Sequence, residues 1–225
     1  SSPARLAWPR CFPIIERMLQ RAWVSLVQRG FHSLYTAFAP GYDLVAWVVS
    51  KGDWQAWGRA SLAHLESGPI LELGSGPGHL LPHLAAAHPV AVGVELSPAM
   101  LRLAQGRRDG ASLVCARAQA LPFGDAVFRS VVSTFPAPYI VHPDTLAEIG
   151  RVLADGGRLI VVDDAILAGA DPWTWIVNLA YRLTARSLAD TLWAQRAAAH
   201  RLRFTHYRHV SPHGSVAALV GEKVP

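Results

Sequence analysis

The chain has 225 residues, of which 51% are hydrophobic and 16% are charged, and its formal net charge is +5. This length suits one α/β domain with a full core, and the hydrophobic content excludes an intrinsically disordered chain. No uncharged stretch reaches the ~18 apolar residues of a membrane-spanning helix. The two cysteines, Cys11 and Cys115, lack metal-binding or redox spacing, so we expect a reduced, cytoplasmic compartment and no metal site.

The first expected element is an amphipathic helix over residues 12–30. Its apolar positions recur at helical spacing and include Trp23, while arginines occupy the opposite face. This composition is typical of an interfacial helix, which predicts peripheral contact with an anionic membrane, at its inner face, through residues 10–30. The alternative is a helix that packs on its own domain or on a second subunit.

Basic charge is concentrated at the two ends of the chain. Residues 1–33 and residues 171–209 each sum to +4, and the remaining residues sum to −3. This asymmetry indicates anionic partners near the ends. The eight tryptophans do not alternate with basic residues in a track, so we expect a lipid surface and no nucleic acid.

Residues 31–66 are rich in aromatic side chains and predict one or two further helices. We therefore expect residues 1–66 to form an N-terminal helical extension and cap, and residues 67–225 to form an α/β domain.

Short apolar runs and helical stretches then alternate along the chain. Strands are expected at 69–73, 91–96, 112–116, 130–135 and 158–163, with helices at 78–88, 97–107 and 143–153. A helical insertion is expected at 171–200, followed by an antiparallel hairpin of residues 202–210 and 215–223. The predicted fold class is α/β, with a Rossmann-like, mostly parallel seven-stranded sheet, an antiparallel C-terminal hairpin and an N-terminal helical extension.

The segment "ILELGSGPGHLLPHLAAAHPVAVGVELSP" (70–98) contains a strand, a glycine turn, a helix and a second strand. A dinucleotide fingerprint would require a glycine at position 79, where this chain has His79. Glu72, two residues before the first glycine, favours a ligand with a positive amino group over a pyrophosphate. Glu95, at the end of the second strand, is placed to accept hydrogen bonds from two ribose hydroxyls. These residues predict an adenosine ligand without a pyrophosphate.

Five segments, in order, resemble the class I S-adenosylmethionine-dependent methyltransferases, and within them the ubiquinone/menaquinone-type family. The segments are "FAPGYDLV", "LELGSGPGHL", "GVELSPAMLRLA", "AQALPFGDAVFRSVVST" and "LAEIGRVLADGGRLIVVDD". The resemblance spans roughly residues 35–164 and implies that residues 67–225 form a methyltransferase domain. It further implies S-adenosylmethionine as cofactor and S-adenosylhomocysteine as product.

The resemblance also implies a set of cofactor-binding residues at the carboxyl edge of the sheet. They are Glu72, Gly74, Ser75, Gly76, Gly78, Glu95, Leu96, Ala118, Gln119 and Ser133. Two departures affect this site. Arg117 stands where the family has an aspartate that accepts from the adenine amino group, so Gln119 or a backbone carbonyl must accept instead. The loop "TFPAPYIVHP" also differs from the family's histidine-bearing sequence.

Methyl transfer requires a base only for some acceptors. Tyr35, Tyr42, Tyr139, His32 and His142 are all candidates, and we assign Tyr42, Tyr139 and His142 as the candidate bases. Tyr42 is the best of these, because the resemblance places "GYD" at the edge of the cofactor. The alternative for each is a structural role, which we favour for Tyr139 and His142. Asp163 and Asp164 are expected at a solvated strand end rather than in catalysis.

These observations predict an enzyme that methylates a small lipophilic molecule or a lipid headgroup at a membrane surface. By resemblance, the nearest options are quinone-precursor methylation and phospholipid-amine methylation. A soluble methyltransferase of secondary metabolism is one alternative. The other is a cofactor-binding but inactive protein that docks on a partner.

Overall fold

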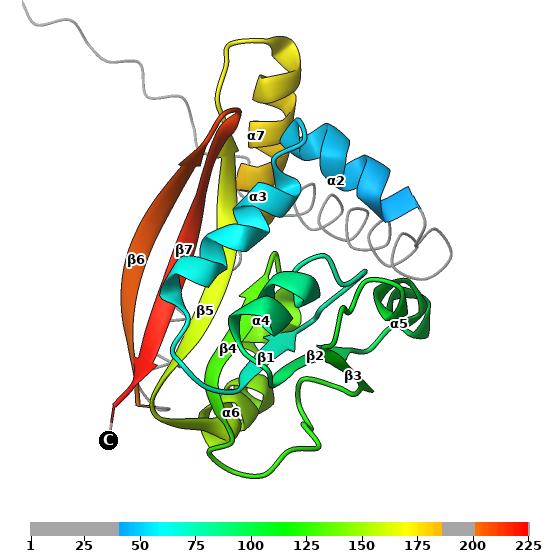
Figure 1. Ribbon diagram of the computed structural model, residues 1–225. Coiled ribbons are helices and arrows are strands. Elements are labelled where there is room, and N and C mark those ends of the chain that lie inside the picture. The colour runs from blue at the N-terminus through cyan, green and yellow to red at the C-terminus, as the bar shows by residue number, and fades with distance from the viewer. Residues whose placement is uncertain (1–40, 186–200, 225) are drawn as a thin grey trace, which may run out of the picture.

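The computed structural model describes residues 41–185 and 201–224 (Figure 1). The helix expected at residues 12–30, its membrane contact, and residues 186–200 of the insertion lie outside the described residues. Within the described ranges, no helix combines the length and the apolar character that crossing a membrane requires.

The described residues form a seven-stranded sheet in the order β3-β2-β1-β4-β5-β7-β6. The strands are β1 Ile70–Leu73, β2 Ala91–Glu95, β3 Ser112–Cys115, β4 Phe128–Thr134, β5 Leu153–Leu167, β6 Leu202–Ser211 and β7 Gly214–Lys223. Strands β1 to β5 pair in parallel, whereas β7 is antiparallel to both β5 and β6. The predicted fold class and the C-terminal hairpin are therefore confirmed.

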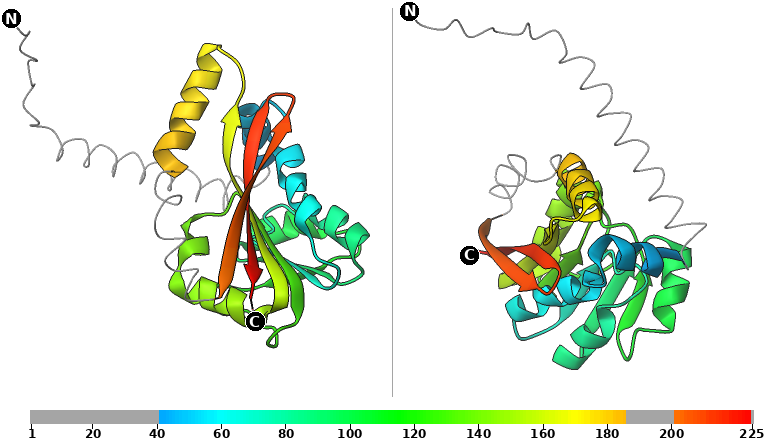
Figure 2. Two further views of the ribbon diagram at one scale, coloured as in Figure 1. Left: turned by 90° about the vertical axis from the view of Figure 1, so that its left-hand side faces the viewer. Right: turned by 90° about the horizontal axis from the view of Figure 1, so that it is seen from above.

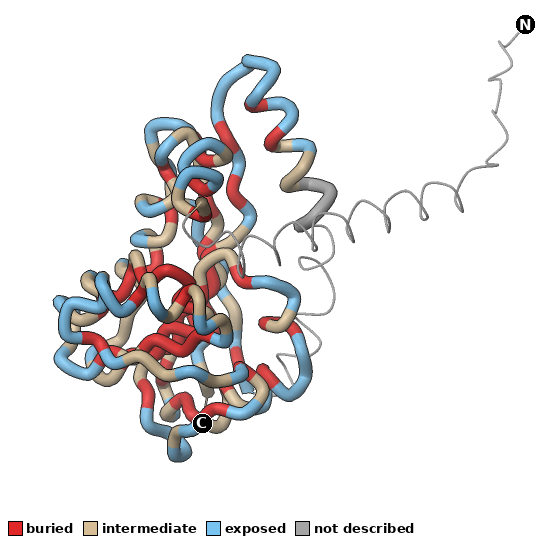
Figure 3. The backbone as a smooth tube through the Cα atoms, turned by 90° about the vertical axis from the view of Figure 1, so that its right-hand side faces the viewer, coloured by how far each residue is buried: buried red, intermediate tan, exposed pale blue. Residues whose placement is uncertain are grey.

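Helices cover both faces of this sheet. They are α2 Tyr42–Ser50, α3 Trp54–Arg59, η2 Ala60–His64, α4 Leu81–Ala87, α5 Pro98–Gln105, η3 Pro138–Val141, α6 Pro143–Val152 and α7 Pro172–Ala185. Alternate residues of β5 enter two separate cores: Leu159 packs with α6, and Ile160 packs with α3, α4 and α7. Figure 3 shows the buried residues concentrated at the centre, in the sheet between these layers.

Two elements differ from the prediction by three residues or more at one end or both. The helix expected from residue 78 begins at Leu81, because Gly78 has φ +84° and still belongs to the turn. The fifth strand runs from Leu153 to Leu167 instead of 158–163, because Leu153 pairs with Phe128 of β4 at one end and the antiparallel partner β7 pairs with Ile166 and Leu167 at the other. Figure 2 shows this long strand and the β6–β7 hairpin, whose turn lies at the same end of the molecule as α7.

The hairpin positions the segment that precedes the sheet. Trp57 of α3 donates its indole N–H to Ser211 Oγ (2.8 Å), and the backbone N–H of His213 donates to Asp53 Oδ2 (2.9 Å). Trp57 itself is only 1% exposed. These contacts fix α3 beside the carboxyl end of β1, where the strand order reverses and α/β folds bind their ligands.

Candidate active site

The turn after β1 combines three glycines with positive φ, which are +77° at Gly74, +52° at Gly76 and +84° at Gly78. A Cβ at Gly74 would collide with the hydroxyl of Tyr139, and one at Gly78 would lie 2.8 Å from the Cβ of Ala104. A Cβ at Gly76 would meet nothing within 4 Å. Gly74 and Gly78 therefore permit close packing, whereas Gly76 exposes bare backbone to open space.

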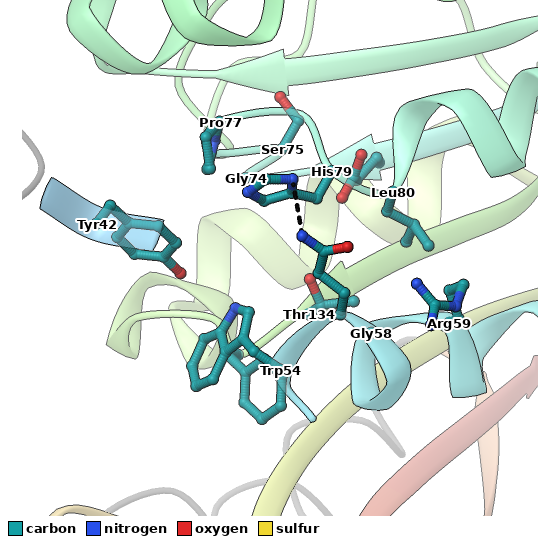
Figure 4. Close-up of a pocket in the computed structure, with 14 residues that line it drawn as sticks. Tyr42, Trp54, Gly58, Arg59, Gly74, Ser75, Pro77, His79, Leu80 and Thr134 are labelled. Carbon is teal, nitrogen blue, oxygen red and sulfur yellow. Dashed lines mark hydrogen bonds between the residues drawn. The ribbon is translucent and has the colours of Figure 1, made fainter. Parts of the chain in front are cut away.

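This glycine loop forms one wall of a pocket, and α2 and α3 form the opposite wall (Figure 4). The pocket has an empty volume of about 510 Å³, which includes its open mouth. Its lining residues are Tyr42, Trp54, Gln55, Gly58, Arg59, Glu72, Gly74, Ser75, Gly76, Pro77, His79, Leu80, Thr134 and Phe135. Segments that are 60 residues apart in sequence thus meet at the carboxyl edge of the sheet.

Glu72 is the most unusual polar group in this wall. Its side chain belongs to β1 and is 2% exposed, and its Oε2 atom has no hydrogen-bond partner among the described residues. Burial raises the pKa of Glu72 well above its usual value, and the nearby carboxylate of Glu95 raises it further. A buried, unpartnered carboxyl group beside a pocket is suited to bind a cation, such as the ammonium group of an amino acid.

Glu95 lies at the end of β2 and is 7% exposed. Its carboxylate holds the glycine loop, since Oε2 accepts from the backbone N–H of Gly76 (3.1 Å) and Oε1 accepts from that of Ser97 (2.7 Å). Each carboxylate oxygen retains a further lone pair for a ligand hydroxyl. Glu95 therefore supports the loop in addition to its predicted contact with ribose.

We expect Glu95→Ala to weaken donor and product binding alike, by about 1.5–3 kcal/mol, because charge-assisted hydrogen bonds are lost. The melting temperature should fall as well, because the N–H groups of Gly76 and Ser97 lose their shared acceptor. Calorimetry with S-adenosylhomocysteine and a thermal melt measure the two effects. Unchanged affinity together with a lowered melting temperature would reduce Glu95 to a purely structural residue.

The other predicted cofactor residues fall into two groups. Ser75 lines the pocket. Its Oγ atom, like the Oε2 atom of Glu72, has no hydrogen-bond partner among the described residues. Leu96, Ala118 and Gln119 lie outside the pocket lining, although residues 116–119 follow β3 at the edge where β2 ends. Ser133 is fully buried and donates to the carbonyl of Leu73 (2.7 Å), so it supports the end of β1 and does not face the pocket.

The three candidate bases differ in their access to the pocket. Tyr42 lines the pocket, as predicted. Tyr139 donates its hydroxyl proton to the carbonyl of Leu73 (3.0 Å) from behind Gly74, outside the pocket lining. His142 caps α6 by accepting from the N–H of Asp144 (3.2 Å), with about half of its side chain exposed. The structure thus gives Tyr139 and His142 the structural positions that the sequence favoured for them.

Asp163 and Asp164 do not lie at a solvated strand end, contrary to the prediction. They lie inside β5 at an irregularity in its pairing with β7, where Asp164 has φ +54°. Burial, together with the charge of Asp164, raises the pKa of Asp163 to about 6. Asp164 forms an ion pair with Arg208 of β6 (2.8 Å), so its carboxylate links β5 to the hairpin.

Sequence reasoning missed an aromatic wall in the pocket. The rings of Trp54 and Phe135 stack at 4.0 Å, and Tyr42 meets Trp54 edge-on at 6.3 Å. Phe135 has φ +47°, a conformation that is rare for a bulky residue and typical of functional sites. The available signal was the position of Phe135, directly after the strand that adjoins β1.

Four polar residues of this region were also missed: Asp43, Gln55, Arg59 and His79. Asp43 Oδ1 lies 2.6 Å from His79 Nε2, and His79 Nδ1 lies 3.4 Å from Gln55 Nε2, the contact dashed in Figure 4. Arg59 lines the pocket and forms no ion pair with another described residue. The replacement of a fingerprint glycine by His79 was a signal, although it did not identify the partner of the imidazole.

Known proteins share both the sequence and the fold of this region. Residues 71–161 match the family described as "Methyltransferase domain". The chain is 35% identical over 140 residues to the demethylmenaquinone methyltransferase of Thermus thermophilus. That match covers 58% of this chain and 64% of the relative, so the chain spans less than two thirds of the relative's length.

Two solved structures have the same fold at lower identity. A SAM-dependent methyltransferase from Thermotoga maritima is 18% identical with a TM-score of 0.61, covering 85% of this chain and 98% of that one. The geranyl diphosphate C-methyltransferase of Streptomyces coelicolor, solved with Mg²⁺, geranyl diphosphate and S-adenosyl-L-homocysteine, is 15% identical with a TM-score of 0.54, covering 75% and 79%. The sheet order, the glycine loop and the sequence match together make residues 71–161 similar to a methyltransferase domain, and the chain similar to the demethylmenaquinone methyltransferases.

Proposed function

We propose that the protein is an S-adenosylmethionine-dependent methyltransferase that acts on a small lipophilic acceptor of the quinone-precursor type. The observation that carries this proposal is the pairing of open backbone at Gly76 with the unpartnered carboxyl of Glu72. A ligand for this pocket needs a compact group near the loop and a cation near Glu72. The methionine part of S-adenosylmethionine satisfies both needs.

S-adenosylmethionine supplies a methyl group on a positively charged sulfur. Glu72 binds its ammonium group, Gly76 lets the backbone approach it, and Glu95 accepts from its ribose hydroxyls. Arg59 has the charge to bind the carboxylate of the same amino-acid part. The protein's main contribution is then alignment and exclusion of water, because a displacement at a methyl carbon needs its reacting atoms in line.

The aromatic wall supports a flat acceptor. Trp54 and Phe135 present stacked rings beside the loop, and a planar ring gains both apolar burial and favourable ring contacts there. The name of the Thermus thermophilus relative, a demethylmenaquinone methyltransferase, favours a quinone precursor over a phospholipid amine. Tyr42 remains the candidate base at this wall, with its ring edge-on to Trp54.

The decisive experiment is incubation of the protein with methyl-labelled S-adenosylmethionine and a bacterial lipid extract, followed by identification of the labelled product. A labelled quinone precursor supports the proposal. A labelled water-soluble metabolite would instead identify a soluble methyltransferase of secondary metabolism. Donor binding without transfer to any lipid or metabolite extract would identify a non-catalytic binding protein.

We also propose that acceptor capture takes place at the cytoplasmic surface of a membrane. Helices α2 and α7 lie side by side at one end of the molecule, and Trp173 donates to the carbonyl of Val48 (3.2 Å) between them (Figure 1). Together they expose Leu44 (65%), Trp47 (62%) and Trp175 (67%). Exposed tryptophans beside a basic chain segment are typical of surfaces that enter the interface of an anionic bilayer.

The double substitution Trp47→Ser, Trp175→Ser should weaken binding of the full chain to anionic vesicles about tenfold. The reason is the loss of roughly 60 Å² of apolar burial, at ~25 cal/mol per Å². Co-sedimentation at two salt concentrations measures it, and the binding of both proteins should weaken as salt screens the basic residues. Val90→Ser, at a 46% exposed position away from both helices, is the matched control. Equal binding by the double variant and the control would contradict this surface.

A further inference from the structure

Asp43 of α2 makes two polar contacts with segments outside its own helix. Its Oδ1 lies 2.6 Å from His79 Nε2, at the end of the glycine loop, and its Oδ2 accepts from Arg107 Nη2 at 2.8 Å. Arg107 also donates from Nη1 to the carbonyl of Pro77 (3.2 Å). One carboxylate therefore joins α2 to two successive parts of the loop.

The two halves of the glycine loop are held in different ways. The first half is fixed to the sheet, since the N–H groups of Gly74 and Ser75 donate to the carbonyl of Val94 and that of Gly76 donates to Glu95. In the second half, Pro77 and His79 are contacted by the side chains of Arg107, Asp43 and Gln55. The second half is therefore held by α2, by α3 and by Arg107, which follows α5, together with the N–H of Gly78, which donates to the carbonyl of Ser75 (2.9 Å).

The opposite end of α2 is tied elsewhere. Lys51 forms an ion pair with Asp171 (2.7 Å) and donates to Thr174 Oγ1 (2.7 Å), which belongs to α7. Neither contact involves a residue of the pocket lining. Asp43 therefore links one end of the helix to the glycine loop, and Lys51 links the other end to Asp171 and α7. Each link can be removed by a separate substitution.

We propose that Asp43 is a positioning residue that couples helix α2, which forms one wall of the pocket, to the glycine loop. A ligand that orders the loop would then also order α2, and with it the adjacent Tyr42 and the acceptor side of the pocket. The inference rests on the proposed function in one respect, namely that the ligand of the loop is the methyl donor. It adds that donor binding and the acceptor side of the pocket are coupled, because the two walls share this carboxylate.

The coupling can be measured as hydrogen exchange of the α2 amides with and without S-adenosylhomocysteine. In the wild-type chain, product binding should slow exchange over residues 43–50. In Asp43→Asn that extra protection should be lost, and product affinity should fall about threefold to tenfold, the size expected for partly exposed charge pairs in a network. Asp43→Glu, which retains the charge, should recover part of both effects.

Asp171→Asn is the matched control, since it removes the ion pair at the other end of α2 and should leave the ligand-induced protection intact. Arg107→Gln provides a second route, because it removes the branch of the link that runs through Arg107 to Pro77 while the contact between Asp43 and His79 stays in place, and it should reproduce part of the loss. Full ligand-induced protection in both Asp43→Asn and Arg107→Gln would overturn the coupling, as would an equal loss in Asp171→Asn. Wild-type binding without any protection of α2 would overturn the coupling alone, whereas no binding by the wild type would overturn the proposed function and the coupling together.

Discussion

Replacing Gly76 with valine should abolish binding of S-adenosylmethionine while the protein stays folded. Gly76 has φ +52°, and a Cβ built on it points into open space beside the pocket. A valine side chain there fills the space that the donor needs, and its branched Cβ also disfavours the positive φ. We expect affinity to fall by more than about 100-fold, because the loss combines a steric block with strain of about 1–3 kcal/mol. Calorimetry with S-adenosylhomocysteine measures the affinity.

Gly110→Val distinguishes steric blocking of the donor from the backbone strain of a valine at positive φ. Gly110 also has a positive φ, +92°, and a Cβ there likewise meets nothing within 4 Å, but the residue lies outside the pocket lining. This control should lower the melting temperature by a similar amount and leave donor affinity unchanged. Wild-type affinity in Gly76→Val would remove the glycine loop from the donor site.

The fold could be predicted because its signals are local. Apolar runs bounded by glycine and proline identified the parallel strands, and the turn at residues 211–214 identified the hairpin. The carboxyl end of β5 could not be predicted, because Ile166 and Leu167 are held by pairing with β7, a strand that follows 47 residues later in the chain. Pairing over such a separation leaves no pattern in the strand's own sequence.

The site, like the fold, could be predicted where its residues are close together in the sequence. Glu72, the glycines and Glu95 lie within one strand–turn–helix–strand segment, so their spacing alone placed them at one edge of the sheet. Asp43, Trp54 and Phe135 come from three other elements, and their contacts with the loop or with one another depend on tertiary packing. Ser133 was assigned to the cofactor for its position at the right edge, but the direction of its side chain depends on the pleat of β4.

Glu72→Gln should weaken donor binding about 10- to 100-fold, because a charge-assisted contact with the donor ammonium, worth roughly 1.5–3 kcal/mol, is replaced by a neutral one. The substitution preserves the shape of the side chain in a site that is 2% exposed. In the free protein, burial raises the pKa of Glu72 well above its usual value, so donor binding to the carboxylate must displace a proton at pH values below that pKa. Wild-type affinity should therefore increase as pH rises through the raised pKa of Glu72, and the affinity of the variant should not.

The same substitution should affect stability in the opposite direction to donor affinity. A carboxyl whose pKa is raised by folding contributes stability below its unfolded pKa, near 4.5, and loses that contribution as pH rises through the folded pKa. At neutral pH, Glu72→Gln should therefore melt at the wild-type temperature or above it, although its donor affinity is lower.

Glu148→Gln is the control, because it should change the melting temperature in the opposite direction. Hydrogen bonds from Arg151 lower the pKa of Glu148, so its contribution is present above the unfolded pKa, and its removal should lower the melting temperature at neutral pH without changing donor affinity. A Glu72→Gln protein that bound the donor as tightly as the wild type at every pH would show that the buried carboxyl does not bind the ammonium group.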